Sequence, residues 1–145
     1  MLPLMQALYR EDGTAPLDVP AARRALDELL ARRELGCVWL AVAAQDPPCA
    51  RPAGLERTVG YVVLTLGFSL EWHGRDAFID ELYVAPERRG CGIGRALLAV
   101  AEGEARRAGV RALHLEVEPG NRRARAVYER AGYADNGRRL ATKRL

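Results

Sequence analysis

Three glycines and three arginines stand close together in residues 84–95, which read Val-Ala-Pro-Glu-Arg-Arg-Gly-Cys-Gly-Ile-Gly-Arg. Glycine lacks a Cβ and takes positive φ readily, so successive backbone N–H groups in such a turn can point at one anion. The helical pattern that follows would add the partial positive charge of a helix N-terminus, and Arg88, Arg89 and Arg95 would add full charges. We therefore predict a binding site for a diphosphate group in this turn.

Other nucleotide-binding loops fit this segment poorly. A dinucleotide fingerprint that starts at Gly92 would need glycine or alanine where Leu97 stands, and no acidic residue follows at close to the expected ~20 positions. A P-loop needs Gly-Lys followed by Ser or Thr, which the chain lacks. The plainer interpretation, a flexible connection that only caps the helix, stays open.

Several elements are needed to position this turn. Apolar periodicity, capping residues and turn residues predict an alternation of helices and strands. We expect helices at residues 4–9, 19–34, 93–109 and 121–131, and strands at 37–42, 58–66, 77–84, 112–117 and 138–143. The prolines at 47, 48 and 52 and Gly54 predict a hairpin loop at 46–54, and the three strands from 37 to 84 should form an antiparallel meander.

Composition predicts one soluble domain over residues 1–145, with 49% hydrophobic and 28% charged residues and no apolar run of the roughly 20 residues that a membrane span requires. The three cysteines are widely spaced, which favours reduced thiols over a disulfide framework or a metal site. The apolar residues 1–5 lack the basic flank and long apolar stretch of a secretory signal, so we expect a cytoplasmic protein. Because 22 basic residues are offset by 19 acidic ones, the net charge of +3 is a weak argument for nucleic acid. A polyphosphate cofactor would account for the net positive charge equally well.

Four segments resemble motifs of the GNAT acetyltransferases. Residues 89–94 resemble the family's Arg/Gln-x-x-Gly-x-Gly/Ala signature, and residues 79–86 resemble its fourth strand. Residues 113–117 resemble its fifth strand, and residues 121–133 resemble its Asn-x-x-Ala-x-x-x-Tyr-x-x-x-Gly-Phe helix, with Tyr133 in place of the phenylalanine. The specific resemblance covers residues 79–133.

The resemblance implies an α/β (α+β) fold, in which a mixed, mostly antiparallel central sheet is flanked by helices and splayed between the family's strands 4 and 5. The chain departs from the family at its start, because it opens directly on the helical residues 4–9 and the family's first strand is absent. Either the natural start codon lies upstream, or the bare sheet edge is covered by another segment or subunit, for example in a homodimer.

The resemblance also implies acetyl-CoA as the cofactor. The family's fourth strand pairs its exposed backbone with the pantetheine arm, the glycine turn binds the diphosphate, and Asn121 either bonds the cofactor arm, caps its own helix or does both. The residues implied in cofactor binding are Leu82, Tyr83, Val84, Arg89, Gly90, Cys91, Gly92, Ile93, Gly94, Arg95, Asn121, Ala124 and Tyr128.

Transfer to an alkylamine, with a pKa near ~10, requires a base that removes a proton directly or through water. Asp80 and Glu81 are the candidates, and strand alternation predicts that they point to opposite faces, so that only one faces the acceptor. The resemblance favours Glu81, while Asp80 has the analogous place in polyamine-type relatives. His114 is a further candidate base, although a lone strand histidine is more often only packed or exposed.

The leaving thiolate, whose thiol has a pKa near ~8.5, needs a proton donor, and Tyr128 stands at the family's position for that acid. Cys91 has no histidine near it in sequence, so we treat its thiol as a bystander in the chemistry. These residues predict direct acetyl transfer to a primary amine of a small molecule or peptide. The alternatives are a non-catalytic CoA-binding regulatory domain, and a nucleic-acid-binding domain that uses Arg122, Arg123, Arg125 and Arg130.

Overall fold

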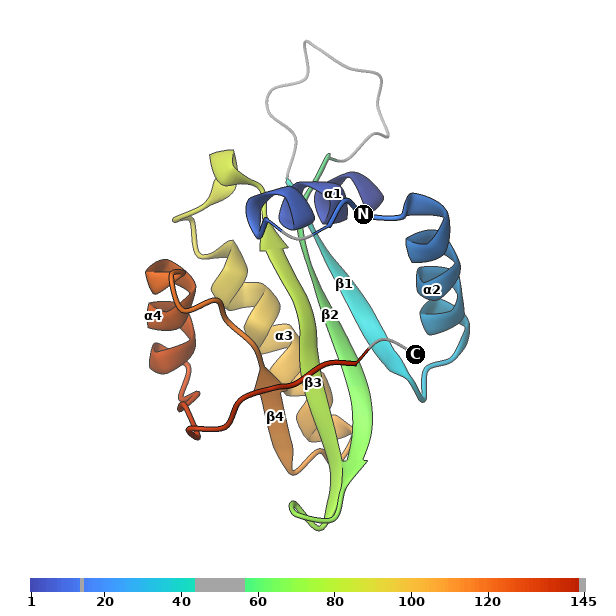
Figure 1. Cartoon of the computed structure of the whole chain (residues 1–145), viewed down its shortest axis with the longest axis vertical. Coiled ribbons are helices and arrows are strands. Elements are labelled where there is room, and N and C mark those ends of the chain that lie inside the picture. Colours follow the sequence, from blue (N-terminus) through green and yellow to red (C-terminus); the bar gives the residue numbers. More distant parts are fainter. Residues whose placement is uncertain (14, 44–56, 144–145) are drawn as a thin grey trace.

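The computed structural model describes residues 1–13, 15–43 and 57–143, and it places helices on both faces of one four-stranded sheet (Figure 1). Along the chain the elements are α1 (Leu2–Glu11), α2 (Val19–Ala31), β1 (Gly36–Ala43), β2 (Arg57–Ser69), β3 (Gly74–Val84), the 3₁₀ turn η1 (Pro86–Arg88), α3 (Ile93–Arg107), β4 (Ala112–Leu115) and α4 (Arg122–Arg130). The hairpin loop predicted at residues 46–54 lies outside the described residues.

The strands follow one another across the sheet in the order β1-β2-β3-β4. The pairs β1–β2 and β2–β3 are antiparallel, as the predicted meander requires, and β4 is parallel to β3. The prediction of a mixed, mostly antiparallel sheet flanked by helices is therefore confirmed. In the part of the chain that the structure describes, no helix is both long and apolar enough to cross a membrane.

Each face of the sheet buries its own core, because side chains on β2 alternate between the two faces. Val62 and Leu64 face α3 and pack with Ile79, Leu97 and the small residues of that helix. Tyr61 and Val63 face the opposite side and pack with Tyr83 and with Met5 of α1. The central strands are thus covered by helices on both sides, which explains their nearly continuous apolar sequence.

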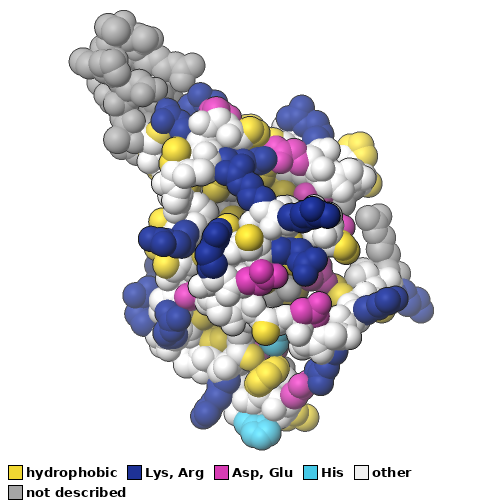
Figure 2. Space-filling view, turned by 90° about the vertical axis from the view of Figure 1, so that its left-hand side faces the viewer, with side chains coloured by type: hydrophobic (Ala, Val, Ile, Leu, Met, Phe, Trp, Pro, Cys, Tyr) yellow, Lys and Arg dark blue, Asp and Glu magenta, His cyan; other side chains and the backbone are white. Residues whose placement is uncertain are grey.

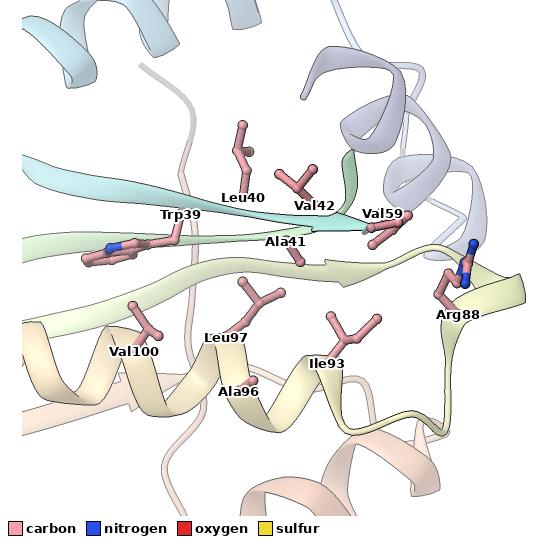
Figure 3. A pocket seen from close by; sticks show the side chains of 11 residues that line it. Trp39, Leu40, Ala41, Val42, Val59, Arg88, Ile93, Ala96, Leu97 and Val100 are labelled. Atoms are coloured by element: carbon pink, nitrogen blue, oxygen red, sulfur yellow. The ribbon is translucent and has the colours of Figure 1, made fainter. Parts of the chain in front are cut away.

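Helix α3 lies on the sheet through residues spaced three or four apart. Figure 3 shows Ile93, Leu97 and Val100 on the side of α3 that faces the sheet, with Ala41 of β1 pointing toward them and Leu40 pointing to the other face. These side chains line an apolar pocket, and Arg88 is the only charged residue among its described lining residues. These described residues therefore offer no carboxylate or imidazole for acid–base chemistry.

Strand β3 contains a β-bulge that the sequence did not predict. Val63 pairs with Glu81 but the next residue of β2 pairs with Ile79, so Asp80 is an extra residue in β3. In a regular strand Ile79 and Tyr83 would lie on the same face of the sheet. The bulge reverses the alternation between them, because Ile79 lies in the core beneath α3 and Tyr83 lies in the core beneath α1. The prediction that Asp80 and Glu81 point to opposite faces assumed a regular strand, and the bulge interrupts that alternation at these two residues.

Strand β4 is shorter than predicted, and this shortening opens the sheet. It ends at Leu115 rather than at Val117, because its register with β3 covers only the four pairs from Asp76↔Ala112 to Ile79↔Leu115. At the bulge β3 turns away, so the residues that follow Leu115 have no strand to pair with. The predicted splay between the family's strands 4 and 5, which are β3 and β4 here, is confirmed at this point.

The prediction of a strand at residues 138–143 is wrong, since the structure contains no strand in this segment. Its side chains are exposed, including Leu140 with 71% of its surface accessible, so the segment lacks the buried face that favours strand pairing. Arg138 of this segment forms an ion pair of 2.6 Å with Glu71 in the β2–β3 turn. Helix α2 also ends earlier than predicted, at Ala31 rather than near residue 34.

Glycine is required where β1 begins. Gly36 has a φ of +154°, and a Cβ placed on it would lie 2.0 Å from the carbonyl oxygen of Leu64 on the paired strand. We predict that Gly36→Ala lowers the free energy of unfolding by roughly 2–4 kcal/mol, because backbone must move on both strands. Gly103→Ala in α3 is the control, since nothing lies within 4 Å of the new methyl group and φ there is not positive.

That control should raise the free energy of unfolding by about 0.5–1 kcal/mol, because alanine favours a helix interior over glycine. Urea unfolding followed by circular dichroism measures both changes on the same scale. Equal stability of the two variants would contradict the close approach of β1 and β2 at Gly36.

Candidate cofactor cleft and active site

One broad cleft collects nearly all the residues that the sequence singled out. It lies between β3, β4, α1, α4 and the glycine turn. On the face shown in Figure 2, basic side chains are spread over much of the surface and acidic side chains lie between them. The predicted residues that line the cleft are Asp80, Glu81, Leu82, Tyr83, Val84, Arg89, Gly90, Gly92, Ile93, Gly94, Arg95, His114, Asn121, Ala124 and Tyr128. Cys91 is exposed and does not line it.

The turn between β3 and α3 has the backbone of an anion site. Gly90 and Gly92 take φ values of +85° and +81°, and Gly92 is the N-cap of α3 without a side-chain cap. The first N–H groups of a helix have no acceptor within the helix, so those of α3 remain available beside the turn. Both glycines adopt a conformation that other residues rarely take, which explains the glycine spacing in the sequence.

Arg89 is held away from the mouth of this turn. Its Nε donates to the carbonyl of Val84 at 2.8 Å, and its Nη2 forms an ion pair of 2.6 Å with Glu11 of α1. The guanidinium also lies over the ring of Tyr83, 5.3 Å from the centroid. The hydroxyl of Tyr83 donates to Glu11 at 2.8 Å, so one carboxylate ties α1 to β3 and to the turn.

The pKa of Glu11 reflects this tie. Desolvation alone would raise the pKa, but hydrogen bonds from Arg89 and Tyr83 outweigh it and the pKa is lowered. Desolvation and the hydrogen bond to Glu11 together raise the pKa of Tyr83 to about 12. Much of the charge of Arg89 is therefore offset inside the protein.

Arg123 reaches the turn from α4, and sequence reasoning missed it as a neighbour of the glycines. A methyl group on Gly90 would lie 3.6 Å from its Nη2. Among the described residues, neither Arg95 nor Arg123 has a carboxylate within 4.0 Å. Two cations without a counter-charge thus lie beside free N–H groups, an arrangement that an anion would stabilise. The contact joins distant parts of the chain, and no local pattern could have predicted it.

The second half of β3 exposes one backbone edge to the cleft. Val84 lies opposite Gly60 of β2. The N–H of the next residue, Ala85, donates to the carbonyl of Val59, which shows that Val84 and Gly60 form a non-hydrogen-bonded pair of the antiparallel ladder. The peptide groups of Val84, and by alternation those of Leu82, therefore point away from β2. Because β4 ends at Leu115, these peptide groups face the cleft. There the carbonyl of Val84 accepts a hydrogen bond from the Nε of Arg89.

Glu81 is hydrogen-bonded beneath α1. The buried phenol of Tyr61 donates to its Oε2 at 2.8 Å, and Tyr9 of α1 also interacts with it by hydrogen bonding. Desolvation raises the pKa of Glu81, the neighbouring Asp80 raises it further, and the two phenols lower it in part. The net shift is upward, toward the range in which a carboxylate can accept a proton efficiently at neutral pH.

Further carboxylates lie around Glu81. Asp80 keeps contact with solvent, yet protein surrounds it densely enough that desolvation raises its pKa. Burial raises the pKa of Asp12 as well, and the negative charges of Glu118 and Glu11 add to that effect. This part of the cleft is therefore acidic, in contrast to the cationic turn at its other end.

Tyr128 lies on α4, partly buried against the core beneath α3, and its ring packs edge-on against Tyr133 with centroids 6.0 Å apart. Desolvation, followed by the charge of Asp12, raises its pKa, which keeps the phenol protonated at neutral pH.

The Oδ1 of Asn121 accepts a hydrogen bond from the N–H of Ala124 at 3.0 Å. Asn121 therefore caps α4, which is one of the two roles predicted for it.

The remaining candidates are placed less favourably for chemistry. His114 pairs with Phe78 in the sheet register, and its Nε2 lies 3.8 Å from Asp76. Its ring packs near Trp72 and Phe78, so the histidine is part of an aromatic cluster near the β2–β3 turn. Among the described residues, no group of three or more histidine, cysteine, aspartate or glutamate side chains could hold a metal ion.

Known proteins share this arrangement. An uncharacterized N-acetyltransferase of Bacillus subtilis, YhfO, is 35% identical over 78 residues, which make up 54% of this chain and 52% of that protein. A thialysine N-epsilon-acetyltransferase of Bos taurus is 35% identical over 77 residues, 53% of this chain and 45% of that protein. The chain thus spans about half the length of these curated relatives.

The solved structure of an integron cassette protein, from the mobile metagenome of Cole Harbour Salt Marsh, aligns with a TM-score of 0.77 and 38% identity, over 99% of this chain and 81% of that one. The family model described as "Acetyltransferase (GNAT) family" matches residues 5–133, which include the sheet, the glycine turn, α3 and α4. The chain therefore belongs to the acetyltransferase (GNAT) family.

Proposed function

We propose that the protein is an acetyl-CoA-dependent N-acetyltransferase that transfers the acetyl group directly to a primary amine of a small molecule or peptide. The observation that carries the proposal is the layout of a single cleft. A turn beside which Arg95 and Arg123 have no carboxylate partner among the described residues lies at one end, the edge of β3 beyond its pairing with β4 lies in the middle, and a desolvated carboxylate lies at the bulge. Diphosphate, pantetheine and amine need these three features in this order.

The residues of the cleft fit coenzyme A by charge and by backbone geometry. The N–H groups at the start of α3, with Arg95 and Arg123, would hold the diphosphate. Leu82 would exchange backbone hydrogen bonds with the pantetheine amides, as an added strand does. When bound, the cofactor supplies the acetyl thioester. Arg89 would contribute mainly through its backbone, because its side chain is tied to Glu11 and to the Val84 carbonyl.

Glu81 would act as the base, directly or through a water molecule. It would remove a proton from the acceptor ammonium so that a neutral amine attacks the thioester carbonyl. Because its pKa is raised, the carboxylate holds a transferred proton more readily than an exposed glutamate does. Tyr128 would donate its phenolic proton to the sulfur as the C–S bond breaks. The acceptor, the cytoplasmic location and the oligomeric state belong to this proposal as predictions from the sequence.

We predict that Tyr128→Phe lowers kcat at least about tenfold while the KM for acetyl-CoA changes less than about twofold, because a proton donor acts mainly in the transition state. The measurement is thiol release from acetyl-CoA with polyamines, amino acids, aminoglycosides and peptides as acceptors. Tyr133→Phe is the control: the hydroxyl of Tyr133 is buried and faces Glu102 of α3 rather than Asp80 or Glu81, so its loss should leave kcat within about twofold.

The same assay tests the function itself. A non-catalytic CoA-binding domain would gain thermal stability from acetyl-CoA and release thiol with none of the acceptors. Unchanged turnover of Tyr128→Phe in an active enzyme would remove the phenol from the mechanism and leave the reaction class intact.

We predict that Arg123→Gln raises the KM for acetyl-CoA about tenfold to a hundredfold, because a hydrogen bond to a charged group is worth roughly 1.5–3 kcal/mol. Arg122→Gln is the matched control, since the neighbouring Arg122 does not line the cleft. The comparison is repeated with acetyl-pantetheine, which lacks the diphosphate. There the two variants should behave alike, and an equal loss with both thioesters would contradict a phosphate contact.

A further inference from the structure

The carboxylate of Glu81 is held by phenols that come from two different elements. Tyr61 stands on β2, two residues from the Val63 that pairs with Glu81, and its side chain is fully buried. Its hydroxyl donates to Oε2 at 2.8 Å. Tyr9 of α1 also forms a hydrogen bond with this carboxylate. Glu81 is therefore anchored by hydrogen bonds from two elements that lie far apart in the sequence.

The bulge at Asp80 is what makes this anchoring possible. In a regular strand Glu81 would share a face with Ile79, which lies in the core beneath α3. The extra residue turns Glu81 to the face of Tyr61 and Tyr83 beneath α1. The phenol of Tyr61 has no other hydrogen-bond partner among the described residues, and an unsatisfied buried hydroxyl is unfavourable. The position of Glu81 and the choice of tyrosine at position 61 thus depend on each other.

We propose that Tyr61 and Tyr9 are positioning residues that hold the carboxylate of Glu81 in one orientation toward the acceptor part of the cleft. The proposal rests on the proposed function, in which Glu81 is the base. Tyr61 does not line the cleft, and both phenols are proposed to act through Glu81. Tyr61 fixes Oε2 of the carboxylate, and the lone pairs that the phenols leave free would accept a proton from the acceptor amine or a water molecule.

The groups that face Glu81 set the expected effect of removing a phenol. They are Tyr61 from β2, Asp80 from β3, Tyr9 from α1, and Asp12, the C-cap of α1. The two phenols favour the ionised carboxylate, whereas the two aspartates and burial oppose it. Loss of the Tyr61 hydroxyl therefore raises the pKa of Glu81. A base must be deprotonated to act, so the acidic limb of kcat/KM moves to higher pH.

The experiment measures kcat/KM against pH for wild type, Tyr61→Phe and Tyr83→Phe with one acceptor amine, whose own titration is the same in every variant. We expect the acidic limb of Tyr61→Phe to move up by roughly one pH unit, as the loss of one hydrogen bond to a charged group predicts. Tyr83→Phe is the matched control, because its phenol lies on the same face and bonds Glu11 instead. Its acidic limb should stay where it is in wild type.

Tyr9→Phe gives a second test on a side chain that is only partly buried, in case Tyr61→Phe does not fold. It should move the limb in the same direction, while the melting temperature confirms that the variant is folded. An unmoved limb in a folded Tyr61→Phe or Tyr9→Phe would overturn the positioning role. Glu81→Gln separates this outcome from failure of the proposed function: if that variant keeps full activity, Glu81 is not the base.

Discussion

Strand β3 pairs with β2 along nearly its whole length but with β4 along only its first half, and the single extra residue at Asp80 marks the change. A bulge strengthens the local twist and bends the strand that contains it. Here the bend ends the pairing with β4, exposes the backbone of Leu82 and Val84, and moves Glu81 to the face covered by α1. A free edge and an anchored carboxylate therefore have one common cause, which is the register of two neighbouring strands.

Charge divides the cleft into two parts. The glycine turn gathers guanidinium groups from η1, α3 and α4, whereas the bulge and the end of α1 gather carboxylates. Like charges at short range repel, so each group is stable only where solvent or an opposite charge offsets it. Arg89 and Glu11 meet between the two parts and offset one another. An anionic cofactor would offset the remaining positive charge at the glycine turn, and a cationic acceptor would offset the remaining negative charge at the bulge.

Local patterns in the sequence predicted most of the fold and the glycine turn. Apolar periodicity identified α3, and the Asp18 side chain caps α2 at Ala21, as expected from its position. The positive φ values of Gly90 and Gly92 likewise follow from residue type. The bulge could not be predicted in this way, because residues 79–84 read as a regular strand and the extra residue appears only in the pairing with β2. The alternation argument failed at Asp80 for this reason, and β4 was predicted too long for the same reason.

Helix α1 best illustrates what the sequence alone conceals. Residues 4–9 predicted a short helical piece with no role, yet in the fold Tyr9, Glu11 and Asp12 of this region interact with Glu81, Arg89 and Glu118. Each of these interactions joins residues about 70 or more positions apart, so periodicity and spacing contain no trace of them. Because α1 contacts both the proposed base and the arginine beside the glycine turn, a shift of this helix would change the two ends of the cleft together.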